Sequence, residues 1–488
     1  DIIMKKLKLF LALNFITCCL FAQMPPFNIT SMGWRVYSSY LATSNAEESE
    51  ANQSIIKVYS DDTLICSYKN DDGCYFSAFI LPHIMWQNNS LDPLVVSGLK
   101  RIYINDVDTV YDFTILNDSI FFSGWSISAN KGVLGIISIS EIVGISFANT
   151  GTLGSYILSY IDYKIKKIES FFDGLGGRHV VGIGTNQYND DYFFHFFIST
   201  GFYPNFSINS PGVYMVGWVC QPRNFVNIKL YDIAITDNYV SIVGVNNGNI
   251  PSNNIILFRS SKNSVNNFTY KIFDHSSNIL SLLPITYDTS VLIRHTYDDE
   301  IVILANGFDT SSSNYMHRLV IDCIDMNTFT DIYLSKKISL EEKDLLIKDA
   351  IYNNQDSVLL ILAEGGVIDN DKRNYVIHAK PYSNLSTYEF RYTTTLSSVF
   401  NSIDLLGYHN KYITFGATNN GKGLSCIAVQ KIDTLTNCFE NFFHSVINTI
   451  PIQYNTDNFI FNTDPYINPY FDLFNNHSVG DFLLECSN

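Results

Sequence analysis

The stretch Tyr111–Trp125 (YDFTILNDSIFFSGW) shows the pattern of apolar and polar positions that the rest of the chain repeats. Apolar side chains alternate with other residues on both sides of Asn117–Asp118, and Gly124 follows the second run. Alternation with a period of two is typical of β-strands, and an Asn-Asp pair is typical of a tight turn. The stretch therefore predicts a β-hairpin.

This hairpin pattern recurs along the chain. Tyr231–Val245 (YDIAITDNYVSIVGV) repeats it without a gap, and Ile403–Ala417 (IDLLGYHNKYITFGA) again has Asp and Gly twelve residues apart. Aligned on the first apolar residue after the turn, seven copies are found, at residues 64, 120, 180, 240, 301, 358 and 412. The copies are 56, 60, 60, 61, 57 and 54 residues apart. Each unit has room for four short strands, and such units can bury both faces only by packing against one another.

Helical patterns are nearly absent. The one candidate is Ser339–Leu346, where Ser339 and Glu342 have the spacing of a capping box. We expect a turn or two of helix there, between two units.

Seven four-stranded units of this length resemble a β-propeller, in which sheets pack face to face around a central channel. The resemblance covers about residues 55–433 and implies an all-β fold of seven blades, with six or eight as alternatives. Paired glycines at Gly176–Gly177 and Gly365–Gly366 are similar to those of kelch repeats, but the matching tryptophans and tyrosines are missing. The Trp-Asp ending of WD40 repeats and the sialidase Asp-box are also missing. The chain thus resembles the divergent propellers that bacteria secrete.

The N-terminal residues have the pattern of a secretory signal peptide. Three lysines (Lys5, Lys6 and Lys8) precede the apolar run Leu9–Phe21, and Ala22 offers a cleavage site. The apolar run is shorter than the ~20 residues of a transmembrane helix. We therefore expect an exported protein (periplasmic, cell-surface or secreted), with a lipid anchor at Cys18 or Cys19 as the alternative.

The chain divides into four parts on this basis. Residues 1–22 form the signal peptide, with residues 1–3 expected to lie upstream of the initiator. Residues 23–53 form an N-terminal strand and linker, and residues 54–437 form the blades. Residues 438–488 form closing strands or a partial blade.

Charge and cysteine content exclude several classes of function. The chain has 47 Asp and Glu against 31 Lys and Arg, a formal net charge of −16. Nucleic-acid binding needs a basic face and is not expected. Seven cysteines follow the signal peptide, an odd number with no CxxC spacing, so neither a disulfide scaffold nor a zinc site is expected. Local bridges between Cys66 and Cys74 and between Cys426 and Cys438 remain open.

Candidate site residues follow from the propeller resemblance, which implies that the first strand of each unit lies innermost. Asp112, Asp232, Asp349 and Asp404 would then surround one mouth of the channel, with Asp173 as a looser fifth. Such a ring would attract a cation or an amine. The simpler interpretation is structural, because an Asp at a strand start commonly accepts backbone N–H bonds in its own turn.

Three further residues have two interpretations each. Trp125 would lie on the loop face, where it could stack on a sugar or anchor a protein partner, or it could pack between blades. Arg294 and His295 lie where other copies carry Asp. They could form a polar site in the channel or neutralise a neighbouring Asp.

No catalytic motif is present: the chain has neither a Gly-x-Ser-x-Gly elbow nor HExxH, and its Asp-x-Asp pairs lack the other EF-hand positions. The sequence predicts a monomeric binding protein without cofactor or metal, which recognises a protein or a glycan through one loop face. The alternative is a glycan-active or other hydrolytic enzyme with its site at the channel mouth. A third possibility is a subunit of a surface assembly.

Overall fold

A computed structural model gives the fold of the chain. It describes residues 34–35, 55–60, 63–70, 73–80, 100–104, 106–117, 119–139, 142, 155–173, 176–200, 213–220, 228–246, 254–265, 268–274, 282–284, 291–309, 316–331, 335–339, 345–365, 373–382, 388–392, 397–406, 411–419, 424–431, 439–441, 446–450, 453–455 and 476–478. The predicted signal peptide and the two cysteines considered for lipidation lie outside these residues.

Within the described residues, the chain is all-β and forms seven antiparallel sheets, which follow one another in sequence order. The first three sheets contain β2 (Ile55–Ser60), β3 (Thr63–Asn70), β4 (Gly73–Ile80) and β5 (Lys100–Ile104); then β6 (Thr109–Leu116), β7 (Ser119–Ser126), β8 (Lys131–Ser138) and β9 (Ser155–Ile161); then β10 (Lys164–Phe172), β11 (Arg178–Thr185), β12 (Asp191–Thr200) and β13 (Val213–Cys220).

The remaining sheets repeat this order. The fourth contains β14 (Ile228–Ile235), β15 (Tyr239–Asn246), β16 (Asn254–Ser261) and β17 (Phe268–Asp274), with a short 3-10 helix, η1 (Lys262–Ser264), after β16. The fifth contains β18 (Leu282–Pro284), β19 (Val291–His295), β20 (Glu300–Asp309), β21 (Met316–Asp325), β22 (Thr330–Asp331) and β23 (Ser335–Ser339). The sixth contains β24 (Leu345–Asn353), β25 (Val358–Gly365), β26 (Arg373–Ala379) and β27 (Tyr388–Tyr392). The seventh contains β28 (Ser397–Leu406), β29 (Lys411–Asn419) and β30 (Leu424–Lys431).

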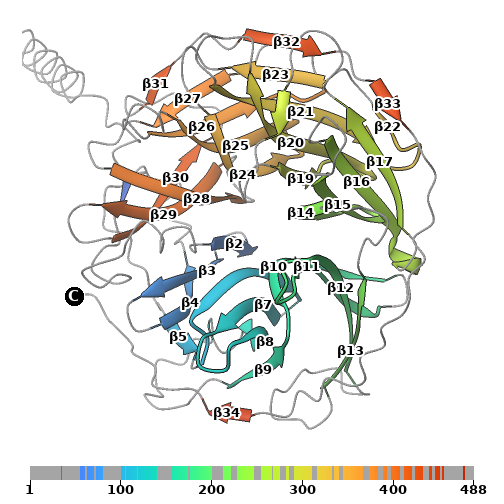
Figure 1. The fold of residues 1–488 in the computed structure, drawn as a ribbon. Coiled ribbons are helices and arrows are strands. Elements are labelled where there is room, and N and C mark those ends of the chain that lie inside the picture. The colour runs from blue at the N-terminus through green and yellow to red at the C-terminus, as the bar shows by residue number, and fades with distance from the viewer. Residues whose placement is uncertain are drawn as a thin grey trace, which may run out of the picture.

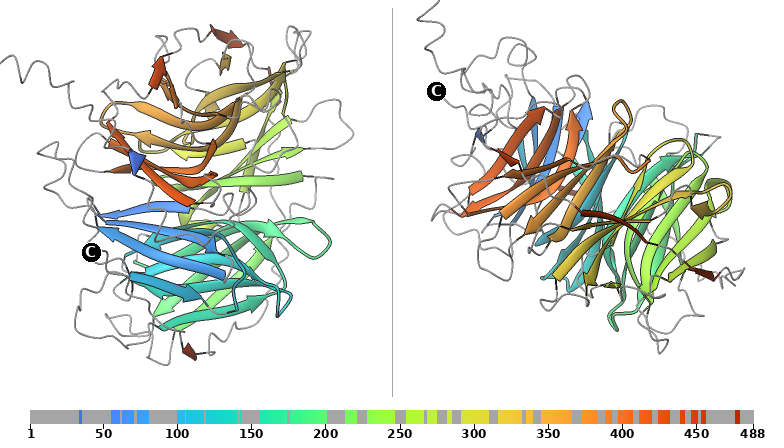
Figure 2. Two further views of the ribbon diagram at one scale, coloured as in Figure 1. Left: turned by 90° about the vertical axis from the view of Figure 1, so that its left-hand side faces the viewer. Right: turned by 90° about the horizontal axis from the view of Figure 1, so that it is seen from above.

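The sheets are arranged around a common axis (Figure 1). One innermost strand of each sheet contacts the innermost strand of the next, in the order β2, β6, β10, β14, β19, β24, β28, and β28 contacts β2. This is the first strand of each sheet except the fifth, where β18 precedes β19. The contacts therefore form a closed cycle. The turned views in Figure 2 show the sheets packed face to face, one behind the other.

The two ends of the chain complete the outer edges of the sheets. A short N-terminal strand, β1 (Trp34–Arg35), pairs with β30 and gives the seventh sheet its fourth strand. In the described residues of the C-terminal part, short strands add to the outer edges of the sixth, fifth, fourth and second sheets, namely β31 (Phe439–Asn441), β32 (Val446–Ile450), β33 (Gln453–Asn455) and β34 (Asn476–Ser478).

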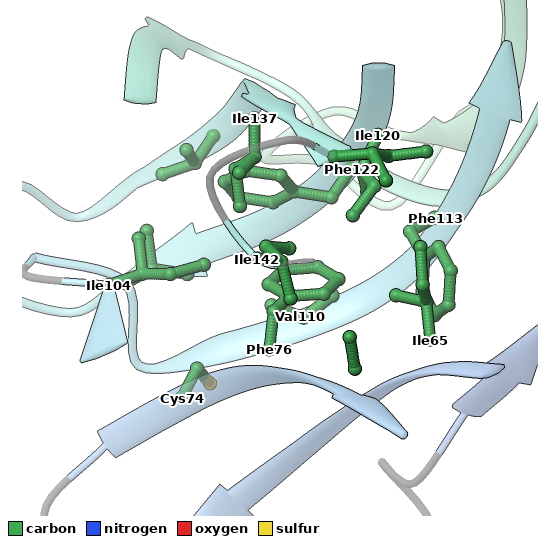
Figure 3. Packing of buried hydrophobic residues seen from close by; sticks show 14 residues of the cluster. Ile65, Cys74, Phe76, Ile104, Val110, Phe113, Ile120, Phe122, Ile137 and Ile142 are labelled. Carbon is green, nitrogen blue, oxygen red and sulfur yellow. The ribbon is translucent and has the colours of Figure 1, made fainter. Parts of the chain in front are cut away.

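The core consists of apolar clusters between consecutive sheets. Phe76 of the first sheet packs against Phe113 and Phe122 of the second, with both ring centroids at 5.3 Å (Figure 3). The adjacent Phe121 belongs to the cluster between the second and third sheets. Successive side chains of a strand point to opposite faces. Because both faces are covered by neighbouring sheets, both carry apolar residues.

The repeated glycine is explained by a close backbone approach. The first strand bulges before Asp112, at Lys166 and before Asp232, and a glycine lies opposite each bulge. A Cβ atom on Gly124 would lie 2.4 Å from the Thr109 carbonyl oxygen, and one on Gly184 would lie 2.1 Å from that of Lys164. No larger residue fits there without a shift of the backbone.

Two local predictions concern the helix and the disulfides. Ser339 ends β23 and Leu345 begins β24, so both ends of the predicted helix belong to strands, and residues 340–344 lie outside the described residues. The candidate bridge between Cys66 and Cys74 is wrong: both thiols are buried and form no disulfide with each other, because they lie opposite Ser77 and Lys69 in the pairing of β3 with β4. Of the second candidate bridge, Cys438 lies outside the described residues. Within the described ranges, no helix has the length and apolar character needed to span a membrane.

Candidate functional site at the ring axis

A cavity of about 610 Å³ lies at the axis, lined by residues from all seven innermost strands. Most of the side chains that the sequence singled out are in this lining: Asp112, Asp232, Arg294, His295, Asp349 and Asp404. Trp125 is not. It lies half-buried on β7, opposite Thr109 and Gly132.

Each of three aspartates joins its own strand to the innermost strand of the next sheet. Asp112 accepts from the backbone N–H of Phe113 (3.0 Å) and, through its other oxygen, from Ile168 of β10 (3.1 Å). Asp349 accepts in the same way from Ala350 (2.8 Å) and from Ile403 of β28 (3.0 Å).

The carboxylate of Asp232 accepts a hydrogen bond from the backbone N–H of Ile293 on β19 at 3.0 Å. These bonds match the structural interpretation of the aspartates, except that they connect neighbouring sheets and do not only close a local turn. A carboxylate that accepts such bonds holds two sheets in register.

Asp404 has a different position from the other three. Asp112 and Asp232 pair with residues eleven positions further along the hairpin, whereas Asp404 pairs with Ile413, nine positions along. The hairpin between β28 and β29 has a longer connection, so a twelve-residue spacing from Gly416 places Asp404 closer to the turn. Ser402 occupies the position directly after the bulge and contacts Ile56.

Asp404 nevertheless connects two sheets. Its carboxylate accepts from the N–H groups of Leu405 (2.8 Å) and of Val58 on β2 (2.6 Å). Burial raises its pKa to about 6, although these two bonds and the charge of Lys57 act in the opposite direction.

Arg294 bridges two of the aspartates. Its guanidinium lies 2.5 Å from Asp232 and 2.6 Å from Asp349, and it also donates to the carbonyl oxygen of Ala350 at 2.5 Å. Burial lowers the pKa of Arg294, but the two carboxylates raise it more, so the side chain is charged. Of the two interpretations of Arg294, the contacts support neutralisation of neighbouring aspartates. His295 faces the turn instead, with Nε2 2.8 Å from the carbonyl oxygen of Asp298.

A second ion pair lies on the wall formed by β2 and β10. Lys57 and Glu169 are 3.3 Å apart, and Thr114 contacts the other carboxylate oxygen of Glu169 at 3.4 Å. Burial raises the pKa of Glu169, as do the charges of Asp112 and Asp232, while Lys57 lowers it. Burial lowers the pKa of Lys57, but Glu169, Asp112 and Asp404 together raise it more.

Lys167 is a charged residue at a repeated aspartate position. It follows the bulge of β10 directly, as Asp112, Asp232 and Asp349 follow the bulges of β6, β14 and β24. The charge of Asp112 raises its pKa; burial and Arg294 lower it, and Asp232 and Asp349 raise it. Among the described residues, its ammonium has neither a hydrogen-bond nor an ion-pair partner.

The lining is balanced in charge. Five basic side chains (Lys57, Lys167, Lys262, Arg294 and Lys348) face five acidic ones (Asp112, Glu169, Asp232, Asp349 and Asp404). This differs from the acidic ring that the aspartate pattern alone predicts. Lys167 and Arg294 lie where other copies carry Asp, and the other basic residues occupy positions that the pattern does not mark. Within the described residues, no cluster of three His, Cys, Asp or Glu side chains could hold a metal ion.

Asp173, the looser candidate, lies away from the aspartates of the lining. It is in the hairpin turn between β10 and β11, where it accepts from the N–H of Gly177 at 2.5 Å and contacts His179 at 3.1 Å. It therefore stabilises a turn.

Comparisons with known proteins do not assign this chain to a family. No family model and no curated protein matches it. One solved structure with some similarity is an ulvan lyase, a polysaccharide lyase bound to a -[GlcA(1-4)Rha3S]- saccharide. It has 11% sequence identity and a TM-score of 0.35, with 82% of this chain and 98% of that chain covered. A TM-score this low does not establish a common fold, and the lyase activity belongs to that protein.

Proposed function

We propose that the chain is a seven-bladed β-propeller that acts as a binding protein and holds its ligand in the axial cavity. The observation that carries this proposal is the cavity itself, to which every innermost strand contributes. The closed cycle of contacts between these strands supports the blade arrangement. So does the pairing of an N-terminal strand with the seventh sheet, which joins the two ends of the repeats.

Binding is favoured over catalysis because the four aspartates of the lining are already engaged. Asp112, Asp349 and Asp404 each accept two backbone N–H bonds, and Asp232 is bound to Arg294. A carboxylate fixed in this way is part of the scaffold and is poorly placed to exchange protons with a substrate.

The volume of the cavity indicates the kind of ligand. Small-molecule sites have volumes of roughly 300–1,000 Å³, and the cavity has about 610 Å³. A cavity of this size could hold a few sugar units but not a folded protein. A glycan is therefore the proposed ligand, and a protein bound on the loop face is the competing outcome.

A glycan array followed by calorimetry with the purified chain tests this proposal. The cavity variant is Ser170→Phe, which places a ring in the lining. The matched control is Ser128→Phe, at the exposed turn between β7 and β8. Glycan binding lost in the first variant and kept in the second supports the axial site. Binding kept in both variants, or a protein partner captured equally by both, contradicts it.

Glu169 favours a second candidate, a glycan-active enzyme. A carboxyl group whose pKa is raised by burial can act as a general acid. The expected result for such an enzyme is release of reducing ends from a bound glycan by the natural chain and at least about a hundredfold slower release by Glu169→Gln. If the glycan is unchanged after long incubation with the natural chain, the enzyme candidate is ruled out and the binding proposal remains.

Export and a monomeric state are further parts of the proposal and rest on sequence. The basic and apolar pattern of residues 1–22 supports export. Expression of the natural gene product with a C-terminal tag, fractionation of the cells and N-terminal sequencing test this. A mature chain that begins near residue 23 outside the cytoplasm is expected. Light scattering of the purified protein measures its oligomeric state.

A further inference from the structure

Among the basic residues that the innermost strands contribute to the cavity lining, Lys167 alone has no hydrogen-bond or ion-pair partner within the described residues. Lys57 is paired with Glu169, Arg294 with two aspartates, and Lys348 with Glu364 at 2.8 Å. The ammonium of Lys167 has three N–H donors and, among the described residues, no acceptor for them. Lys167 is half-buried and lines the cavity, so its ammonium can donate to an acceptor on a ligand that enters there.

An acceptor group lies on the same strand. Glu169 is two residues from Lys167 on β10, so the two side chains leave the strand on the same side, and both line the cavity. Glu169 uses one oxygen for Lys57 and the other for Thr114, which leaves further lone pairs on both oxygens. A ligand at this wall thus meets donors next to acceptors.

The charges around Lys167 restrict what that ligand can carry. A second anion would approach the carboxylates of Asp112 and Asp232, and a cation would approach Lys167 and Arg294. Each would also lose its own hydration on entering the cavity. A hydroxyl group avoids both repulsions, and it can accept from an ammonium and donate to a carboxylate at the same time.

We propose that Lys167 and Glu169 form the primary contact of the axial site with neighbouring hydroxyl groups of a neutral saccharide. This rests on the proposed function as a glycan-binding protein and adds to it the class of glycan and the residues that select it. Lys167 determines specificity as the donor, and Glu169 accepts from the adjacent hydroxyl.

Calorimetry with two matched disaccharides tests the charge of the ligand. Galactobiose and digalacturonate have the same ring size and differ in their carboxylates. Each is titrated into the purified full chain, and a disaccharide of glucosamine represents a cationic ligand. Binding of galactobiose, or of another neutral saccharide found on the array, in preference to its charged counterparts is expected. A preference for the uronate or the amino sugar overturns the proposal.

Lys167→Met tests the contact. Loss of a charge-assisted hydrogen bond weakens binding of the neutral saccharide roughly 10- to 100-fold. The control is Lys166→Met, on the same strand with the same change of charge but outside the cavity lining. It is expected to bind as the natural chain does. If Lys167→Met fails to fold, Lys167→Arg keeps the charge among the aspartates and still moves the donors, and Glu169→Gln tests the acceptor.

The outcomes separate the two proposals. Glycan binding that is insensitive to the Lys167 and Glu169 variants overturns this inference and leaves the binding function in place. Failure of the natural chain to bind any saccharide overturns the glycan-binding function itself, and with it this inference.

Discussion

Arg294 on β19 bridges the innermost strands β14 and β24 through Asp232 and Asp349. Removal of this bridge is the sharpest test of how the ring is held together. Arg294→Met keeps most of the apolar stem and removes the guanidinium. It leaves Asp232 and Asp349 without their shared counter-ion and the Ala350 carbonyl oxygen without its donor.

The size of the effect follows from burial. Breaking a buried ion pair on one side costs about 3–5 kcal/mol. The side chains of Arg294 and Asp349 retain 17% and 21% exposure, so solvent screening favours the lower end, about 3 kcal/mol. With an unfolding entropy of about 2.1 cal/mol/K per residue, a chain of this length loses roughly 3 °C of melting temperature for that change.

Differential scanning calorimetry and urea unfolding at neutral pH measure this loss. Arg294→Lys keeps one positive charge but cannot bridge two carboxylates, so about half of the loss is expected. Arg178→Met, on β11 outside the cavity lining, is the control and is expected to shift the melting temperature by less than about 1 °C. If Arg294→Met behaves like this control, or if Arg294→Lys equals the natural chain, the bridge does not hold the ring together.

Three other predictions concern single residues. Gly184→Ala should destabilise the fold more than Gly244→Ala, by about 1–3 kcal/mol in urea unfolding, because the added Cβ would lie 2.1 Å from a carbonyl oxygen in the first and 2.7 Å in the second. Burial raises the pKa of Asp404 to about 6, so the folded chain binds the proton of this carboxyl group more tightly than the unfolded chain does. The stability that the protonated carboxyl group contributes is full below about pH 4 and is lost as the pH rises through 6. Asp404→Asn should show less of this loss when unfolding is compared at these pH values. Burial lowers the pKa of His378 to about 3, so acidification from pH 7 to 5 should cost about 2 kcal/mol through protonation of the unfolded chain. His378→Phe, which keeps an aromatic ring against Tyr412, should abolish that cost.

The strands were predictable because their signal is local. The alternation in Tyr111–Trp125 reflects strands whose two faces pack on two neighbouring sheets, and the spacing between copies reflects one sheet per copy. The register of the site was not predictable in the same way. Between the bulge and the glycine, the hairpin of β28 and β29 is two residues longer than the hairpins that carry Asp112 and Asp232, so Asp404 lies closer to the turn while Gly416 stays opposite the bulge. Turn length is a property of loops, which vary without changing the strands they join.

The ends of the chain and the basic residues of the site were harder to predict, for different reasons. The pairing of Trp34 with Ala428 joins residues almost four hundred positions apart, and no local pattern encodes a contact at that separation. Lys57 and Glu169 gave no comparable signal, because the apolar residues of β2 and β10 do not alternate regularly and each of these strands contains a bulge. The sequence therefore does not show which of their charged side chains face the axis.

The alignment of the bulges also explains why one repeated position can serve two purposes. At this position Asp112, Asp232 and Asp349 connect neighbouring sheets. Each accepts a hydrogen bond from one backbone N–H of the next innermost strand. Lys167 at the same position can accept no such bond, so β10 lacks this connection to β14. A sheet can forgo it because the apolar cluster between the third and fourth sheets, which includes Phe171 and Ile233, still holds them together. The third sheet instead places the Lys167 ammonium in the axial cavity, where aspartates of three other sheets raise its pKa. Ser402 also departs from the repeated aspartate, but it still connects its sheet to the next through Ile56. Lys167 makes no such connection, and this makes it the first place to look for recognition.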